Sequence, residues 1–328
     1  MSKKFIRVLA LLMVMLAGGI VSFVLISACS GDDDTRSPAK TGQEKVAGGP
    51  KEEPIIIWHW GSYYDDLEPL KLALSTGLVN HVTIGTIHRK DKDFRKDLKV
   101  LKAIKIVKDS GVKLIWLRWL WPAYDVKESR AEDLFDPNFY IKEIRYLRAE
   151  ANEIGADFVA LDTEAYAYSP IQAYDKGEII LKAEDLRRLK AIIKKVIDAA
   201  GKVDFIFPAG TTGNIMPYGI LSELGTNRVS EDTYYSNYEA IKKIKTPYEI
   251  FGAYLNTTRE NKKHPHLPYF LVPEIFDNSY LWSDRKGLYL YPREGNAKAV
   301  AEELVKYARN LPAVRAEKKP QLNIKRAE

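Results

Sequence analysis

Short apolar segments alternate with amphipathic segments along much of the chain, and this alternation restricts the possible folds more than any other feature. Each apolar segment favours a buried strand, and each amphipathic segment favours a helix, several of which stop at a glycine. Such repeats form parallel βαβ units. The predicted strands are 55–61, 81–85, 114–122, 156–164 and 204–208, with helices at 67–78, 93–109, 137–154 and 183–200 between them. Five strands, with room for three more, favour a (β/α)8 TIM barrel over an open doubly wound sheet.

The second half of the chain offers more strand candidates than the barrel has places. The candidates are 232–236, 248–255, 270–276 and 287–291, and the segment 296–309 has the spacing of a closing helix. No Gly-rich phosphate loop follows an early strand, which argues against a nucleotide-binding open sheet. We therefore expect an α/β protein with a single TIM-barrel catalytic domain at 54–312.

The first 28 residues have the order of a secretory signal peptide. Lys3, Lys4 and Arg7 precede an apolar run from Val8 to Ile26, and a basic start followed by an apolar stretch directs export. The next residues complete the sequence Ile26-Ser27-Ala28-Cys29, which resembles the bacterial lipobox. This resemblance implies that the cysteine is lipidated and becomes the new N-terminus. An uncleaved membrane anchor is the alternative, because the apolar run is about long enough to span a bilayer.

The segment behind the signal peptide has the composition of a tether. Residues 29–53 are rich in Gly, Asp, Pro, Lys, Glu and Thr without apolar periodicity, so we expect disorder there and in the polar, basic tail at 313–328. Cys29 is the only cysteine, which excludes an intramolecular disulfide framework. Ser30 favours the outer membrane or cell surface over the inner membrane. The expected location is the extracytoplasmic cell envelope, through a lipid anchor on Cys29.

The net charge is mildly positive and argues against a nucleic acid partner. The formal charge is +6, and removal of the three basic residues before Cys29 lowers it to +3. The lysines fall mostly on helical stretches and form no dense basic patch. No clustered His and Asp pattern indicates a metal site. We expect no nucleic acid, no metal and no cofactor, and a monomeric protein.

Two acids stand at the end of the segment 156–164. An apolar run stops at Asp162, and Glu164 follows after one residue. Alternate residues of a strand share a face, so both carboxylates are expected on one face at the C-terminal end of the fourth strand, where TIM barrels hold their active sites. Neighbouring acids cost stability, and that cost usually has a chemical reason. The alternative is a structural ion pair, or a helix cap formed by Asp162 or Thr163.

Aromatic residues are concentrated after the first and third predicted strands. Some of them must pack under the helices because strand residues alternate, and the rest are expected to ring the barrel mouth and stack on a sugar. Arg118 is expected to pair with Asp162 or Glu164 across the barrel. His59 is expected either to bind a sugar hydroxyl or to lie hydrogen-bonded in the core. The candidate substrate-binding residues are Trp58, His59, Trp60, Trp116, Arg118, Tyr166, Tyr235 and Trp282.

The residues around the two acids resemble a family signature. Asp157-x-x-Ala160-x-Asp162-x-Glu164 is similar to the D-x-x-D-x-D-x-E signature on the fourth strand of chitinase-like (family 18) glycoside hydrolases, with three of four positions matched. The resemblance implies that Glu164 is the proton donor and that Asp162 orients an acetamido nucleophile of the substrate. Ala160 replaces the second Asp of the signature, and the segment 287–291 lacks the Trp expected on the last strand.

A second resemblance keeps the same proton donor. Barrel glycosidases of the large retaining clan carry an acid/base residue at the end of strand four and a nucleophilic Glu at the end of strand seven. If the segment 272–276 is that strand, Glu274 is the nucleophile. Thr163 stands where this clan usually has Asn. Both mechanisms stay open, and both make Glu164 the general acid.

These patterns predict a glycoside hydrolase that cleaves a glycosidic bond in a polysaccharide or glycan. Glu164, Asp162 and Glu274 are its candidate catalytic residues. The main alternative is a non-catalytic carbohydrate-binding surface lipoprotein on a degenerate barrel, which Ala160 and the missing Trp favour. A polysaccharide deacetylase or lyase is a third alternative, but the sequence shows no clustered His and Asp ligands of the kind that a deacetylase needs.

Overall fold

The computed structural model describes residues 53–61, 66–86, 93–119, 135–162, 183–207, 220–230, 249–262, 265, 268–278, 285–293 and 295–311. These ranges all belong to one structural unit that begins at Glu52. The expected signal peptide, all of the expected tether except residue 53, and the basic tail lie outside the described residues. Those expectations, including lipidation of Cys29, stay predictions.

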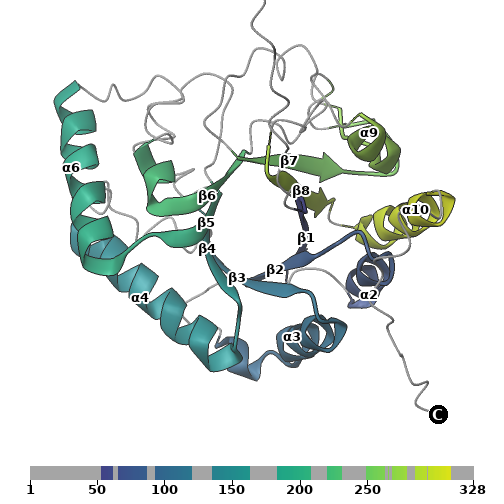
Figure 1. The fold of residues 1–328 in the computed structure, drawn as a ribbon, viewed down its shortest axis with the longest axis horizontal. Coiled ribbons are helices and arrows are strands. Elements are labelled where there is room, and N and C mark those ends of the chain that lie inside the picture. Colours follow the sequence, from purple (N-terminus) through teal and green to yellow (C-terminus); the bar gives the residue numbers. More distant parts are fainter. Residues whose placement is uncertain are drawn as a thin grey trace, which may run out of the picture. The chain divides into compact units, whose positions relative to one another are not determined.

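Eight parallel strands close into a barrel in the order of the sequence, with β8 paired to β1 (Figure 1). The strands are β1 (Ile55–Gly61), β2 (His81–Thr86), β3 (Lys113–Trp119), β4 (Phe158–Asp162), β5 (Val203–Phe207), β6 (Gly225–Ser230), β7 (Ile250–Leu255) and β8 (Gly287–Pro292). The protein is a (β/α)8 TIM barrel, which confirms the fold that the alternation predicted.

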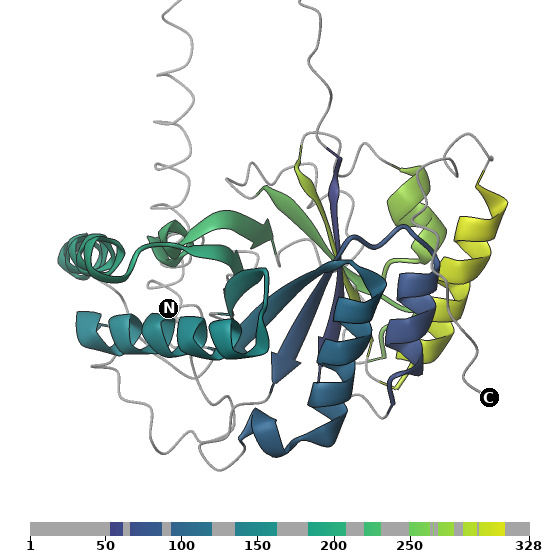
Figure 2. The ribbon, with the colours of Figure 1, turned by 60° about the horizontal axis from the view of Figure 1, so that its bottom comes forward.

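The described helices surround the barrel (Figures 1 and 2). Helix α10 packs beside α2, and α4 packs beside α6. Among the described helices, none combines the length and the apolar character that a membrane span needs. The helices are α2 (Glu68–Ser75), α3 (Leu98–Ser110), α4 (Pro137–Ile154), α6 (Ala183–Ala200), α9 (Val272–Asp277) and α10 (Ala297–Asn310), with 3-10 turns η1 (Phe94–Lys96) and η4 (Ser222–Leu224).

Local signals set the ends of α3 and α4. Helix α4 has the expected bounds, whereas α3 begins at Leu98 rather than at 93, because residues 94–96 form the separate 3-10 turn η1. The carboxylate of Asp97 accepts hydrogen bonds from two backbone N–H groups in the first turn of α3, and that of Asp136 accepts one from the first turn of α4. Such caps satisfy donors that have no partner inside the helix. Gly111 and Gly155 end these helices with φ of 74° and 61°, a left-handed conformation that costs little only for glycine.

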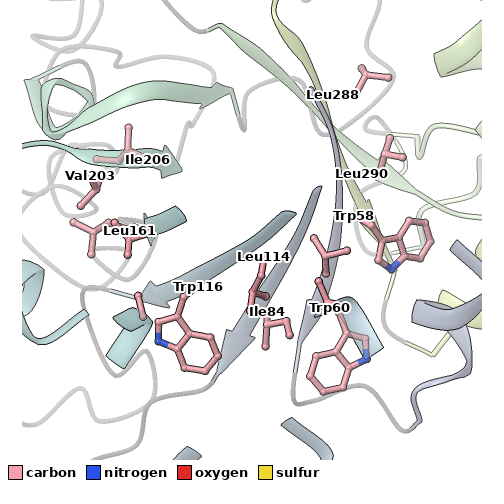
Figure 3. Packing of buried hydrophobic residues seen from close by; sticks show 14 of the residues in the cluster. Trp58, Trp60, Ile84, Leu114, Trp116, Leu161, Val203, Ile206, Leu288 and Leu290 are labelled. Carbon is pink, nitrogen blue, oxygen red and sulfur yellow. The ribbon is translucent and has the colours of Figure 1, made fainter. Parts of the chain in front are cut away.

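The strands separate two apolar clusters, one inside the barrel and one between the strands and the helices. Along β1, Ile57 belongs to the inner cluster, whereas Ile56 and Trp58 belong to the outer one. This is the alternation of side chains expected for a strand that is buried on both faces. Figure 3 shows part of the outer cluster, to which all the strands except β6 contribute.

The structure corrects two predictions for the second half of the chain. The sixth strand is Gly225–Ser230 rather than 232–236, which lies outside the described residues. The prediction of a strand at 270–276 is wrong, because Val272–Asp277 is a helix and Phe270 forms only an isolated bridge with Leu255 of β7. A short apolar run fits a strand and a buried helix equally well, so its surroundings decide.

Two leucines of α3 are exposed although they share the helical spacing of its buried residues. Leu98 and Leu101 recur at this spacing with Ile104 and Val107, yet they are 70% and 38% exposed. The face that packs against the barrel consists of Val100, Ala103, Ile104 and Val107. Two stripes of this helix have helical periodicity, and the contacts of α3 with β2 and β3 decide which of them is buried.

Candidate functional site

Asp162 is the last residue of β4 and faces the interior of the barrel. Phe158 and Ala160, which share its face of the strand, both pack in the inner cluster. The register places Asp162 between Trp119 of β3 and Phe207 of β5. Asp162 is only 7% exposed. It therefore occupies the position that was predicted for one of the two acids, at the C-terminal end of a barrel strand.

The other half of the predicted acid pair lies outside the described residues. This holds for Glu164, and also for Tyr166, Tyr235 and Trp282. The pairing of the two acids stays a prediction.

Three tryptophans that were expected at the mouth belong to the outer cluster instead. Trp58, Trp60 and Trp116 are each fully buried, and Figure 3 shows them among the apolar residues of this cluster. They occupy the outward positions of β1 and β3, so they contact the helix layer rather than a ligand. Their assignment as substrate-binding residues is corrected, and they stabilise the packing of helices on the barrel.

Arg118 is on the same outward face as Trp116, and it does not pair across the barrel. Its Nε donates to Glu143 of α4 at 2.8 Å, and its Nη1 lies 3.4 Å from Oε2 of Glu150. The same Glu150 oxygen accepts a hydrogen bond from the indole of Trp116 at 3.1 Å, and Glu150 is only 3% exposed. The guanidinium also lies over the ring of Tyr146. Arg118 therefore holds α4 against β3, which corrects its assignment to the substrate site.

Glu274 lies near the start of helix α9 rather than at the end of strand seven. Its carboxylate accepts a hydrogen bond from the backbone N–H of Leu271 at 2.9 Å and forms an ion pair with Arg259. This is the position of a capping acid near a helix N-terminus. The strand on which its nucleophilic role was based is absent, since the seventh strand is β7.

His59 lies inside the barrel, in a buried polar cluster. Its Nδ1 is 2.7 Å from the hydroxyl oxygen of Tyr289 and 3.1 Å from that of Thr83. Its ring stacks on Tyr291 with centroids 4.4 Å apart. A Cβ at Gly85 would come within 3.1 Å of the imidazole, so this glycine makes room for the ring. His59 is 1% exposed, which supports the alternative of a hydrogen-bonded core histidine.

Burial keeps the imidazole of His59 neutral. It lowers the pKa of His59 from 6.5 to about 3, because burial removes the hydration that a charged ring would need. A neutral imidazole carries one N–H and one acceptor nitrogen, so Nδ1 can accept from one of the two hydroxyls or donate to one of them. The cluster thus gives this side of the barrel interior hydrogen-bonding groups without a charge.

Tyrosines of the last two strands form a part of the site that was not predicted. Tyr254 of β7 and Tyr291 of β8 are paired in the register, have ring centroids 5.1 Å apart and are both partly exposed. Tyr289, deeper in the barrel, contacts Phe207 of β5. The alternation in 250–255 and 287–292 was a signal for these residues.

These residues give the two sides of the barrel interior different chemistry. The β4 side presents the carboxylate of Asp162, and the β7, β8 and β1 side presents tyrosines and a neutral histidine. Among the described residues, no group of three or more His, Cys, Asp or Glu could hold a metal ion. Acid–base chemistry on a hydroxyl-rich ligand with flat apolar faces fits this arrangement.

No protein-family model and no curated protein matches this chain. Among solved structures, it is similar to the chitinase domain of the spore coat protein CotE from Clostridium difficile, with 14% identity and a TM-score of 0.37. That match covers 60% of this chain and 55% of the chitinase domain, so it spans about half of that structure. The chain is also similar to aminoacrylate-bound tryptophan synthase from M. tuberculosis, with 11% identity, a TM-score of 0.35 and coverage of 78% and 90%.

The neutral His59 predicts a loss of stability in acid. Its pKa in the folded protein, about 3, lies below the unfolded value of 6.5, so the unfolded chain takes up the proton first as the pH falls. The free energy of unfolding should therefore decrease from pH 6.5 towards pH 3, by about 2 kcal/mol at pH 5 from this residue. His59→Asn has no group that titrates in this range at position 59. The difference in free energy of unfolding between the parent and His59→Asn, measured by urea denaturation, should therefore shrink by about 2 kcal/mol between pH 7 and pH 5. Parallel pH profiles of the two proteins would contradict the prediction.

The buried carboxylate of Glu150 predicts a large cost for its removal. Glu150→Ala leaves the indole N–H of Trp116 without its acceptor and removes one of the two anions around Arg118. We expect the free energy of unfolding to fall by about 2–3 kcal/mol at pH 7, measured by urea denaturation. Glu303→Ala, which breaks an exposed ion pair with Lys306, is the control and should have little effect. Equal losses in both variants would show that the buried network is not stabilising.

Proposed function

We propose that this protein is a glycoside hydrolase that acts on a polysaccharide or glycan, with Glu164 as general acid and Asp162 beside it. The observation that carries the proposal is the inward-facing, nearly buried Asp162 at the C-terminal end of β4. A carboxylate placed inside a barrel loses part of its hydration, and this cost supports a chemical role for Asp162.

The mechanism assigns one step to each acid. Glu164 donates its proton to the oxygen of the leaving sugar, and the glycosidic bond breaks as positive charge develops at the anomeric carbon. Asp162 either stabilises this charge or orients the group of the substrate that attacks it. A carboxyl group next to a second carboxylate keeps its proton to higher pH, which suits a general acid.

The tyrosines on the opposite side support a sugar as the ligand. Tyr254 and Tyr291 are partly exposed at the C-terminal ends of β7 and β8. Aromatic rings with a hydroxyl offer both an apolar face for the ring of a sugar and a hydrogen-bonding group for its hydroxyls. These residues replace the tryptophans that the sequence had indicated for this role.

A non-catalytic carbohydrate-binding protein is the second candidate. Ala160 stands where the chitinase-like signature has an Asp, and its side chain faces the barrel interior, fully buried among apolar residues. The inner layer below Asp162 on β4 therefore carries no acid. The tyrosines would serve such a binding protein as well as an enzyme.

The proposal includes attachment to the cell envelope through a lipid on Cys29. It rests on the order of the N-terminal residues and on the position of the single cysteine. Cells that express the chain and are fed radiolabelled palmitate should label it, and Cys29→Ser should abolish the label. Equal labelling of both proteins would contradict the anchor.

Hydrolysis of a panel of glycans and aryl glycosides tests the catalytic role of Glu164. Glu164→Gln keeps the shape of the side chain but has no carboxylic proton to donate. We expect its kcat/KM to fall by at least 100-fold, about 2.7 kcal/mol in transition-state free energy. Glu302→Gln, an exposed acid on α10, is the matched control and should keep full activity.

Other outcomes separate the alternatives. Equal activity of Glu164→Gln and the parent would reject the assignment of the general acid. Glycan binding without turnover in both would favour the binding protein. Glu274→Gln tests the retaining-clan mechanism, in which it should abolish activity. Its place on α9 predicts that activity is retained.

A further inference from the structure

The next inward position after Tyr291 is occupied by an arginine. The backbone N–H of Arg293 donates to the carbonyl of Leu255 at 2.9 Å, which extends the ladder between β7 and β8 by one step. Strand alternation therefore places Arg293 on the inward side, above Tyr289 and Tyr291. A residue at the end of β8 on this side belongs to the mouth of the barrel.

Contacts of the side chain support this placement. The chain at Phe270 pairs with Leu255 beside the upper part of β7. Its neighbour Tyr269 consequently shares the inward face of Tyr254, and their ring centroids are 5.2 Å apart. The guanidinium carbon of Arg293 lies over the ring of Tyr269, 5.3 Å from its centroid. Arg293 thus extends over the tyrosines at the mouth instead of turning away to solvent.

The contacts of Arg293 leave its donors available. It is partly exposed, and within the described part of the chain it forms no ion pair, unlike Arg118 and Arg259, whose carboxylate partners were given above. Stacking on an aromatic ring uses the face of the guanidinium, while its N–H groups lie in the plane and remain free. A stacked guanidinium with free N–H groups is arranged to bind a carboxylate with two parallel hydrogen bonds.

The position of Arg293 separates it from the acids. β4 and β8 lie on opposite sides of the closed barrel (Figure 1), so Asp162 and Arg293 face the mouth from opposite walls. A ligand between them can present a carboxylate to Arg293 without placing it beside Asp162. The neutral state of His59 means that the wall below Arg293 adds no second positive charge.

We propose that Arg293 binds the carboxylate of an acidic sugar, so that the substrate or ligand of this barrel is a glycan that contains uronic acid residues. Tyr254 and Tyr291 contact the ring of the same sugar, and Arg293 selects its charge. This inference rests on the proposed function, because it names the class of glycan that the site accepts.

Binding to matched pairs of oligosaccharides tests the inference. Each pair combines a hexuronate oligomer, such as an oligogalacturonate or an oligoglucuronate, with the uncharged hexose oligomer of the same linkage. Isothermal titration with the full chain in detergent should give at least tenfold tighter binding for the acidic member of at least one pair. In Arg293→Gln this ratio should fall to about one, and Arg293→Lys should retain part of it because a lysine keeps the charge but not the planar donors.

Two controls make the result specific to Arg293. Arg309→Gln removes an exposed arginine from the last turn of α10 and should leave the ratio unchanged. The melting temperatures of all variants should agree with that of the parent, which shows that the fold is intact. Preference for the neutral members, absence of binding to every uronate, or an unchanged ratio in Arg293→Gln would overturn the proposal.

The outcomes also separate this inference from the proposed function. Hydrolysis that depends on Glu164 but occurs only on neutral glycans, with no effect of Arg293→Gln, would support the proposed hydrolase and reject the preference for uronic acids. Uronate binding that depends on Arg293, without hydrolysis of any glycan, would support the preference for uronic acids and reject the proposed hydrolase.

Discussion

Closure of the parallel sheet is the constraint on which the rest of the structure depends. Once β8 pairs with β1, every strand has a neighbour on both sides, and each of its residues faces either the interior or the helices. Backbone hydrogen bonds fix the register, so a shift by one residue would exchange the two faces of a strand. For this reason His59 faces the interior, whereas its sequence neighbours Trp58 and Trp60 pack under the helices.

The two layers treat their buried polar groups differently. In the outer layer, Arg118 forms ion pairs with Glu143 and Glu150, so its positive charge is balanced by carboxylates. Inside the barrel, His59 has hydroxyl partners and remains uncharged. Both arrangements satisfy hydrogen-bonding groups that would otherwise destabilise the fold. The outer network fixes a helix to the sheet, whereas the inner cluster leaves the site neutral below its mouth.

The distribution of charge at the mouth links the fold to the proposed chemistry. Asp162 lies on β4 and Arg293 at the end of β8, on opposite walls of the barrel. An eight-stranded barrel places these walls far enough apart for side chains or one small ligand between them. The tyrosines between β7 and β8 then supply the flat surface that a sugar ring requires. A single scaffold can in this way present an acid and a cation to the same ligand.

The sequence by itself determined the class of fold and most elements of its first half. Helices α4 and α6 have the predicted bounds, because the spacing of their apolar residues and, at the ends of α4, Asp136 and Gly155 are local signals. Only the tertiary structure decided which face of each strand is inward, since alternation distinguishes two faces without identifying them. It also decided that the polar segment Gly225–Ser230 is β6, through pairing with β5, and that Val272–Asp277 is a helix. Asp162 could be predicted because an acid that ends an apolar strand is visible in the sequence. Arg293 could not, because its neighbour Tyr269 is distant in the chain and only the folded barrel brings the two together.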